Sequence, residues 1–190
     1  MNLDAVVQSA WRAYDREEYG DMVAYASQLV SAGDPWAVQG YFLRGMANEH
    51  WAGGSEDRLR SAVSDYRVAA ILAPHANAYQ NLARALMKMG HSHYEEAYRY
   101  LLEGWKFEQT PELMLGFGNY FYTKPMPDLK QALTFNRRAA MRGRFRGFVV
   151  AAQICRSAGN PLQARLWGLA RIVLSPVIWL IQGRRAMFEF

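Results

Sequence analysis

Two histidines, His91 and His93, are separated by a single serine. Histidine is a common metal ligand, so this pair is the first candidate for a metal site. A protein metal site needs three or four ligands that converge at bond distance. The remaining histidines, His50 and His75, are far away in the sequence, and the pair itself follows Gly90 in a turn-like segment. We therefore interpret His91 and His93 as solvated turn residues and expect no metal site.

Adjacent acidic residues, which acid–base catalysis could use, occur in this chain as Glu17-Glu18, Glu56-Asp57 and Glu95-Glu96. Each pair falls where a helix is expected to begin, and the positive end of the helix dipole stabilises acids there. The sequence has no phosphate-binding glycine-rich loop, and it has neither a His-Glu-x-x-His nor a Gly-x-Ser-x-Gly motif. We expect a protein that is not an enzyme, with no catalytic residues and no cofactor.

Positive charge is concentrated in the second half of the 190-residue chain, whose net charge is +5. Residues 1–95 contain 8 basic and 11 acidic residues and residues 96–190 contain 14 and 6, so the two halves carry −3 and +8. No acid occurs between Asp128 and Glu189, a segment with eleven Lys or Arg. Six of these form a basic patch that is a candidate site for an anionic partner: Lys130, Arg137, Arg138, Arg142, Arg144 and Arg146.

Arginine suits the recognition of carboxylate and phosphate groups, so the basic patch fits an acidic peptide, a lipid headgroup or a nucleic-acid backbone. RNA is the least favoured of these partners, because no known nucleic-acid-binding motif accompanies the basic residues and the nearby phenylalanines. The structural alternative is a solvated face on which some of the arginines cap the carbonyl end of a helix near Gly143.

The C-terminal region combines an apolar run with neighbouring tryptophans and arginines. Residues 172–181 carry no charge, but they are too few to cross a bilayer, which needs about 20 residues. Tryptophan and arginine beside such a run are typical of membrane interfaces. Three roles remain open: a cap on the preceding helices, docking on an anionic membrane surface, or a contact with a protein or a second copy of the chain. The candidate docking residues are Trp167, Trp179, Arg184 and Arg185.

Apolar residues recur at spacings of three and four, as in amphipathic helices, and glycines and prolines divide the chain at regular intervals. The pattern predicts five helix pairs and a last helix from Pro176 to about Met187. The single cysteine, Cys155, is expected to be buried in a helix and cannot form an internal disulfide. The expected pairs are 3–15 with 18–32, 35–50 with 56–73, 75–89 with 93–109, 111–122 with 127–142, and 145–158 with 161–174.

The third pair resembles the tetratricopeptide repeat. Its first helix has an aromatic residue, leucine, a small residue and a large residue at the places that such repeats use for packing, namely Tyr79, Leu82, Ala83 and Leu86. Its second helix has small residues seven apart, at Ala97 and Gly104, and the same spacing relates Ala62 to Ala69 and Ala132 to Ala139. The variable turn lengths also resemble Sel1-like repeats. In the fifth pair Ala164 keeps the pattern and Arg171 breaks it.

This resemblance implies an all-α fold, with residues 1–174 stacked as a right-handed superhelical array and residues 175–190 forming a separate capping or docking helix. It also implies a non-catalytic scaffold that binds a protein or peptide in a concave groove. The N-terminus lacks the basic start and apolar run of a secretory signal, so we expect a cytoplasmic protein, at the inner face of a membrane if the C-terminal region docks there. The candidate groove residues are Tyr41, Arg44, Asn81, Arg84, Asn119 and Tyr120.

Overall fold

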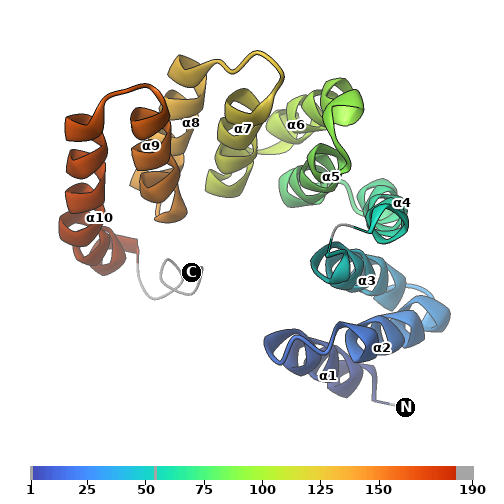
Figure 1. Cartoon of the computed structure of the whole chain (residues 1–190). Helices are drawn as coiled ribbons and strands as arrows, with labels where there is room; N and C mark the ends of the chain where they lie inside the picture. The colour runs from blue at the N-terminus through green and yellow to red at the C-terminus, as the bar shows by residue number, and fades with distance from the viewer. Residues whose placement is uncertain (1, 54, 183–190) are drawn as a thin grey trace. The chain divides into compact units, whose positions relative to one another are not determined.

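The computed structural model of the chain describes residues 2–53 and 55–182, and within these ranges it contains helices and no strand (Figure 1). The chain divides into two compact units, Met1–Gly104 (unit 1) and Trp105–Phe190 (unit 2), with the boundary inside α6. The helices are α1 (Leu3–Asp15), α2 (Tyr19–Ala32), α3 (Trp36–Trp51), α4 (Glu56–Leu72), α5 (Ala76–Met89), α6 (Tyr94–Phe107), α7 (Pro111–Thr123), α8 (Leu129–Met141), α9 (Arg146–Ser157) and α10 (Pro161–Gln182).

Several helices begin at polar side chains that accept hydrogen bonds from backbone N–H groups of the first turn. Thr110 Oγ1 accepts from the Leu113 nitrogen at 3.2 Å, and Asp128 Oδ1 accepts from the Gln131 nitrogen at 3.0 Å. Asn160 Oδ1 does the same for α10. The ten helices of the five expected pairs are confirmed in the described residues, with ends within two residues of the prediction except at the end of α10. Residues His91–His93 form a single 3₁₀ turn, η1, ahead of α6.

The expected break before Pro176 is wrong, because α10 runs without interruption from Pro161 to Gln182. Proline inside a helix removes the hydrogen bond to the carbonyl four residues earlier, here that of Ile172. The Ile172 residue is exposed, so water can satisfy that carbonyl and the helix continues through the proline. Residues 175–182 are thus the end of the fifth pair's second helix and not a separate element.

Within each unit, helices that follow one another in sequence pack against each other. In unit 1, α1 packs on α2, α2 on α3, α3 on α4 and α4 on α5. In unit 2, α7 packs on α8, α8 on α9 and α9 on α10. This order agrees with the expectation that no single pair can bury its apolar face alone.

Small residues allow these helices to approach closely. Ala62 and Ala69 on α4, Ala97 and Gly104 on α6, and Ala132 and Ala139 on α8 are all buried, as their seven-residue spacing indicates. Ala164 is buried as well, whereas Arg171 is exposed. Cys155 is buried on α9, as expected.

Unit 2 is held together mainly by aromatic rings. Phe135 on α8 stacks on Phe117 and Phe121 of α7, with ring centroids 5.0 and 5.8 Å apart. Trp105 meets Phe117 edge to face at 5.2 Å. Such pairs add about 0.5–1.5 kcal/mol each to the free energy of unfolding beyond the area that they bury. The α7–α8 interface is therefore largely aromatic, although it also contains the buried side chain of Asn136, which lies against Gly118.

Helices α2 and α3 approach each other closely at Gly40. A Cβ atom added there would lie 2.6 Å from the backbone nitrogen of Val30 and 2.8 Å from the carbonyl oxygen of Ala26. Backbone atoms cannot rotate away as side chains do, so the two helices would have to separate. Gly40 is therefore the residue that sets the distance between the first and second pairs.

We predict that Gly40→Ala lowers the free energy of unfolding by about 1–3 kcal/mol, the usual cost of overpacking a helix interface. The matched control is Gly20→Ala on α2, where the added Cβ would make an ordinary 3.5 Å contact with Trp51. Urea unfolding followed by circular dichroism measures both variants. Equal midpoints for Gly40→Ala and Gly20→Ala would contradict the tight α2–α3 contact.

Candidate functional site

A buried carboxylate, that of Glu49, lies at the centre of a polar cluster in unit 1. Its side chain is 0% exposed, near the C-terminal end of α3. Arg84 on α5 donates to both of its oxygens, from Nε to Oε1 at 2.8 Å and from Nη2 to Oε2 at 2.7 Å. Lys88 Nζ lies 2.8 Å from Oε1, and Tyr66 Oη on α4 donates to Oε2 at 2.9 Å. These four residues are the Glu49 cluster.

Helix geometry explains how three helices supply the partners of one carboxylate. Arg84 and Lys88 are four residues apart, so they project from the same face of α5. Two like charges at this spacing destabilise an isolated helix, and an acid from another helix removes the repulsion. Tyr66 is buried on α4, which packs against both α3 and α5. The carboxylate is thus paired and hydrogen-bonded, which a buried charge requires.

The electrostatics of the cluster favour the ionised carboxylate. Burial alone would raise the pKa of Glu49, but the hydrogen bond and charge of Arg84, with those of Lys88, outweigh it and lower the pKa to about 2. Burial and then the charge of Glu49 raise the pKa of Tyr66 well above its ordinary value, so the phenol stays protonated and donates. Burial opposes the charge of Arg84, but pairing with Glu49 raises its pKa overall.

One positive charge is left over in this cluster, because Arg84 and Lys88 together carry two charges and Glu49 carries one. The two basic side chains reach the surface, with 34% of Arg84 and 46% of Lys88 exposed. The cations are therefore fixed in position on their inner side by Glu49 and open to an anionic group on their outer side. Salt bridges of this kind hold the donors in a defined geometry before any ligand arrives.

Aromatic rings lie beside the Glu49 cluster. Tyr14 on α1 meets His50 on α3 edge to face at 5.2 Å, and its Oη lies 3.4 Å from His50 Nε2. Tyr19 stacks on His50 with ring centroids 6.1 Å apart. Burial lowers the pKa of His50, and although Glu49 raises it, Lys88 and Arg84 lower it further. Because Arg84 and Glu49 also act on the pKa of Tyr14, these rings and the charged cluster belong to one neighbourhood.

The predicted groove residues of unit 1 divide into different environments. Arg44 donates to both oxygens of Asp65 on α4, from Nε at 3.0 Å and Nη2 at 2.8 Å, and it lies over the Tyr41 ring at 5.3 Å. Its charge is therefore neutralised within the unit. Asn81 is buried, with 8% of its surface exposed, so it offers little area to a partner. Arg84 alone combines a fixed geometry with an unbalanced charge.

The two other predicted groove residues, Asn119 and Tyr120, lie on α7 in unit 2 and are half-buried. The ring of Tyr120 packs against its neighbour Phe121 at 5.3 Å. They therefore belong to the aromatic α7–α8 region, and the groove prediction joins residues from two separate units.

The residues of the basic patch expected around α8 also differ in environment: some have partners within unit 2 and others are exposed. Arg144 is half-buried and paired with Glu112, and burial lowers its pKa although Glu112 raises it. Arg142 donates from Nη1 to the Gln109 carbonyl at 3.0 Å. Arg137 lies over the Trp167 ring at 5.2 Å. Lys130, Arg138 and Arg146 are exposed and remain candidates for contact with an anionic partner.

Of the four predicted docking residues in the C-terminal region, the structure describes the side chain of Trp167. Trp167 is partly buried against Ala140, Phe145 and Phe148, and its ring lies 6.1 Å from that of Phe148. Arg184 and Arg185 fall outside the described residues, as does the side chain of Trp179.

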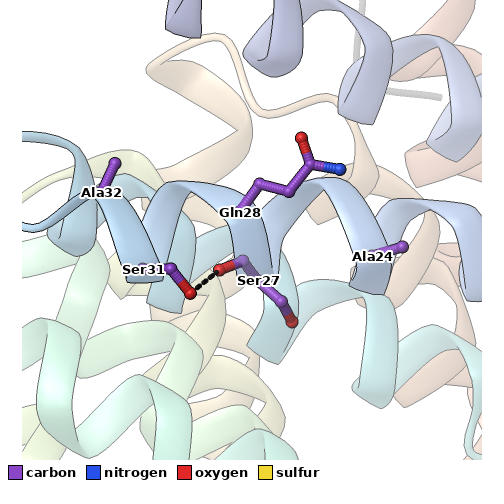
Figure 2. Close-up of a pocket in the computed structure, with 5 residues that line it drawn as sticks. All are labelled: Ala24, Ser27, Gln28, Ser31 and Ala32. Carbon is purple, nitrogen blue, oxygen red and sulfur yellow. Dashed lines mark hydrogen bonds between the residues drawn. The ribbon is translucent and has the colours of Figure 1, made fainter. Parts of the chain in front are cut away.

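Two other features of the described residues were candidates for a site, a metal-ligand cluster and a surface hollow, and neither competes with the Glu49 cluster. The described residues contain no group of three or more His, Cys, Asp or Glu placed to hold a metal ion, and the His91 ring packs on Tyr94 at 5.1 Å. A hollow of about 370 Å³ is lined by residues of α2, whose side chains are drawn in Figure 2. Ser31 Oγ there donates to the Ser27 carbonyl at 3.0 Å, and no charged group lines the hollow. The lining residues are Ala24, Ser27, Gln28, Ser31 and Ala32.

Sequence reasoning identified Arg84 but missed Glu49, Lys88, Tyr66 and His50. Two signals were present: an acid within the apolar end of the 35–50 helix, and an Arg–Lys pair at i, i+4 with no acid of its own helix beside it. Each signal is incomplete alone, because the partners come from different helices.

No protein-family model matches the chain, and a search of the curated proteins finds no match either.

We predict that the stability of the protein depends on pH through Glu49. Its pKa is about 2 in the folded state against 4.5 ordinarily, so its contribution of about 3 kcal/mol is complete above pH 4.5 and is lost as the pH falls toward 2. Glu49→Gln is expected to cost a few kcal/mol at neutral pH, because Arg84 and Lys88 lose their counter-charge, and to flatten this part of the pH profile.

The measurement is urea unfolding at several pH values between 2 and 7. Glu56→Gln on α4 serves as the control, since the Glu56 side chain is 63% exposed in its pair with Arg60. The control should keep the wild-type profile. If the free energy of unfolding of Glu49→Gln fell with pH as steeply as that of the wild type, Glu49 would not be the source of the pH dependence.

Proposed function

We propose that the chain is a non-catalytic scaffold that binds an acidic protein or peptide segment at the Glu49 cluster. We further propose that its helix pairs are tetratricopeptide-like repeats stacked as a right-handed superhelix. The repeat proposal is supported by the buried small residues at seven-residue spacing and by the packing of successive helices within each unit. The binding proposal rests on the geometry around one carboxylate.

The observation that carries the binding proposal is the unbalanced positive charge of Arg84 and Lys88, held in place by buried Glu49. A preorganised cation loses little conformational entropy when a carboxylate arrives, which increases affinity. The rings of Tyr14, Tyr19 and His50 supply an apolar surface next to the charge. Aromatic side chains beside arginine are typical of the residues that dominate binding energies at protein interfaces.

The acid–base properties of the cluster support binding and not catalysis. A general base is most effective when its pKa lies near the working pH. The pKa of Glu49 is about 2, and its oxygens are already occupied by Arg84, Lys88 and Tyr66. It is therefore suited to orienting two cations and poorly suited to accepting a proton from a substrate.

The test is a selection of displayed random peptides on the immobilised full chain, followed by affinity measurement on synthetic copies of the enriched peptides. We expect enriched peptides to contain Asp, Glu or a free C-terminal carboxylate next to an apolar residue. Lys88→Ala should weaken their binding about tenfold, which corresponds to the 1.4 kcal/mol typical of one charge-assisted contact.

Arg99→Ala is the matched control, because Arg99 is an exposed basic residue of unit 1 on α6. It removes the same charge from the same unit and should leave affinity unchanged. Circular dichroism melting checks that both variants are folded. Equal losses in the two variants would mean a diffuse electrostatic attraction, and a selection that enriches no peptide would end the proposal.

A further inference from the structure

An exposed apolar stripe runs along α10, beside the face that packs on the rest of unit 2. Large aliphatic residues recur there every three or four positions, with side chains between 48% and 75% exposed. At 100° per residue they span only about 80° of the helix surface, and the stripe is about 27 Å long. The members of the α10 stripe are Leu162, Leu166, Leu169, Val173, Val177 and Leu180.

A different face of α10, centred about 120° from the stripe, is already used for packing. Ala164 is buried, and Trp167, Ala170 and Leu174 pack against the core cluster of Ala140, Phe145 and Phe148. In Figure 1, α10 lies next to α9 within unit 2. The helix is thus apolar on two sides, and only one of them is covered by this unit. A soluble repeat array normally ends in a polar face, so a contiguous apolar surface of this length indicates a docking site.

Charge distinguishes between the occupants that such a stripe could have. Residues 105–182 contain 11 basic and 3 acidic residues, and no acid occurs after Asp128 within that range. Of the three acids, Glu112 is paired with Arg144 and Asp128 caps α8. A second copy of unit 2 would bring the same excess of positive charge against itself. An anionic surface would instead be attracted to it, by about 1 kcal/mol per basic residue at the membrane surface.

Arg165 connects the charge to the stripe. It is exposed, and it lies three residues after Leu162 and four before Leu169, so it is a neighbour of both on the helix surface. An arginine in this position can extend its guanidinium to lipid phosphates while the leucines enter the acyl region. This is the arrangement of helices that lie in the membrane interface.

We propose that unit 2 docks reversibly on an anionic membrane surface through the α10 stripe, with the helix lying in the plane of the interface. No helix in the described part of the chain is long and apolar enough to cross a membrane, which agrees with docking by one face. The docking residues differ from those expected at the sequence level, since Trp167 belongs to the packed side of α10. The site is separate from the Glu49 cluster, so either proposal can fail without the other.

The experiment is co-sedimentation of the full chain with vesicles of phosphatidylcholine alone or with one third phosphatidylserine. We expect the anionic vesicles to bind the chain at least tenfold more strongly, and added salt to weaken that binding. Leu166→Ser with Leu169→Ser should reduce it at least tenfold, because two exposed leucines no longer enter the acyl region. Arg165→Glu should reduce it as well.

The matched control is Ile71→Ser, which removes a highly exposed aliphatic side chain from α4 in unit 1 and should leave binding unchanged. Circular dichroism confirms that each variant is folded, which is expected because the substituted side chains are exposed. The proposal is overturned if the full chain stays in the supernatant with anionic vesicles, or if the double leucine variant binds as the wild type does. A molar mass that rises with concentration, and falls to that of one chain in the double variant, would assign the stripe to a second copy instead.

Discussion

The ionised carboxylate of Glu49 is the constraint on which unit 1 depends. A charge without exposed surface is tolerated only when donors surround it, and the donors come from α4 and α5 while the acid comes from α3. The positions of these three helices are therefore coupled by directional bonds as well as by apolar packing. The bidentate Arg44–Asp65 pair adds a further link between α3 and α4, beside the single bond from Tyr66 to Glu49. Directional bonds fix the register of helices more sharply than leucines and alanines can.

Unit 2 is stabilised in a different way. Its interfaces contain stacked phenylalanines, small residues and the buried Asn136, and Arg144 is paired with Glu112. Its arginines consequently have few acids to pair with, and several of them remain at the surface. The two units also carry net charges of opposite sign. Residues 1–104 contain 9 basic and 13 acidic residues, whereas residues 105–190 contain 13 basic and 4 acidic residues.

The helices could be predicted from the sequence because their signals are local. Gly33 and Gly90 end helices, while Thr110, Asp128 and Asn160 begin them by capping, and each acts within a few residues. The buried role of Ala97 and Ala132 also follows from spacing along one helix. The proline rule failed at Pro176, because a lost backbone hydrogen bond is tolerable where the carbonyl is on an exposed side. The Glu49 cluster was beyond prediction since its members are separated by up to 39 positions, from Glu49 to Lys88.

The position of Glu49 has a consequence for how unit 1 folds. In an ideal repeat protein each pair contacts only its neighbours, and stability is close to a sum of independent repeat and interface contributions. Here the carboxylate on the second pair has its strongest partners on the third, and His50 beside it meets Tyr14 of the first pair. If α5 opened, Glu49 would lose both of its cationic partners and keep only Tyr66 of the cluster. We therefore expect α3, α4 and α5 to gain and lose structure together and not as independent repeats.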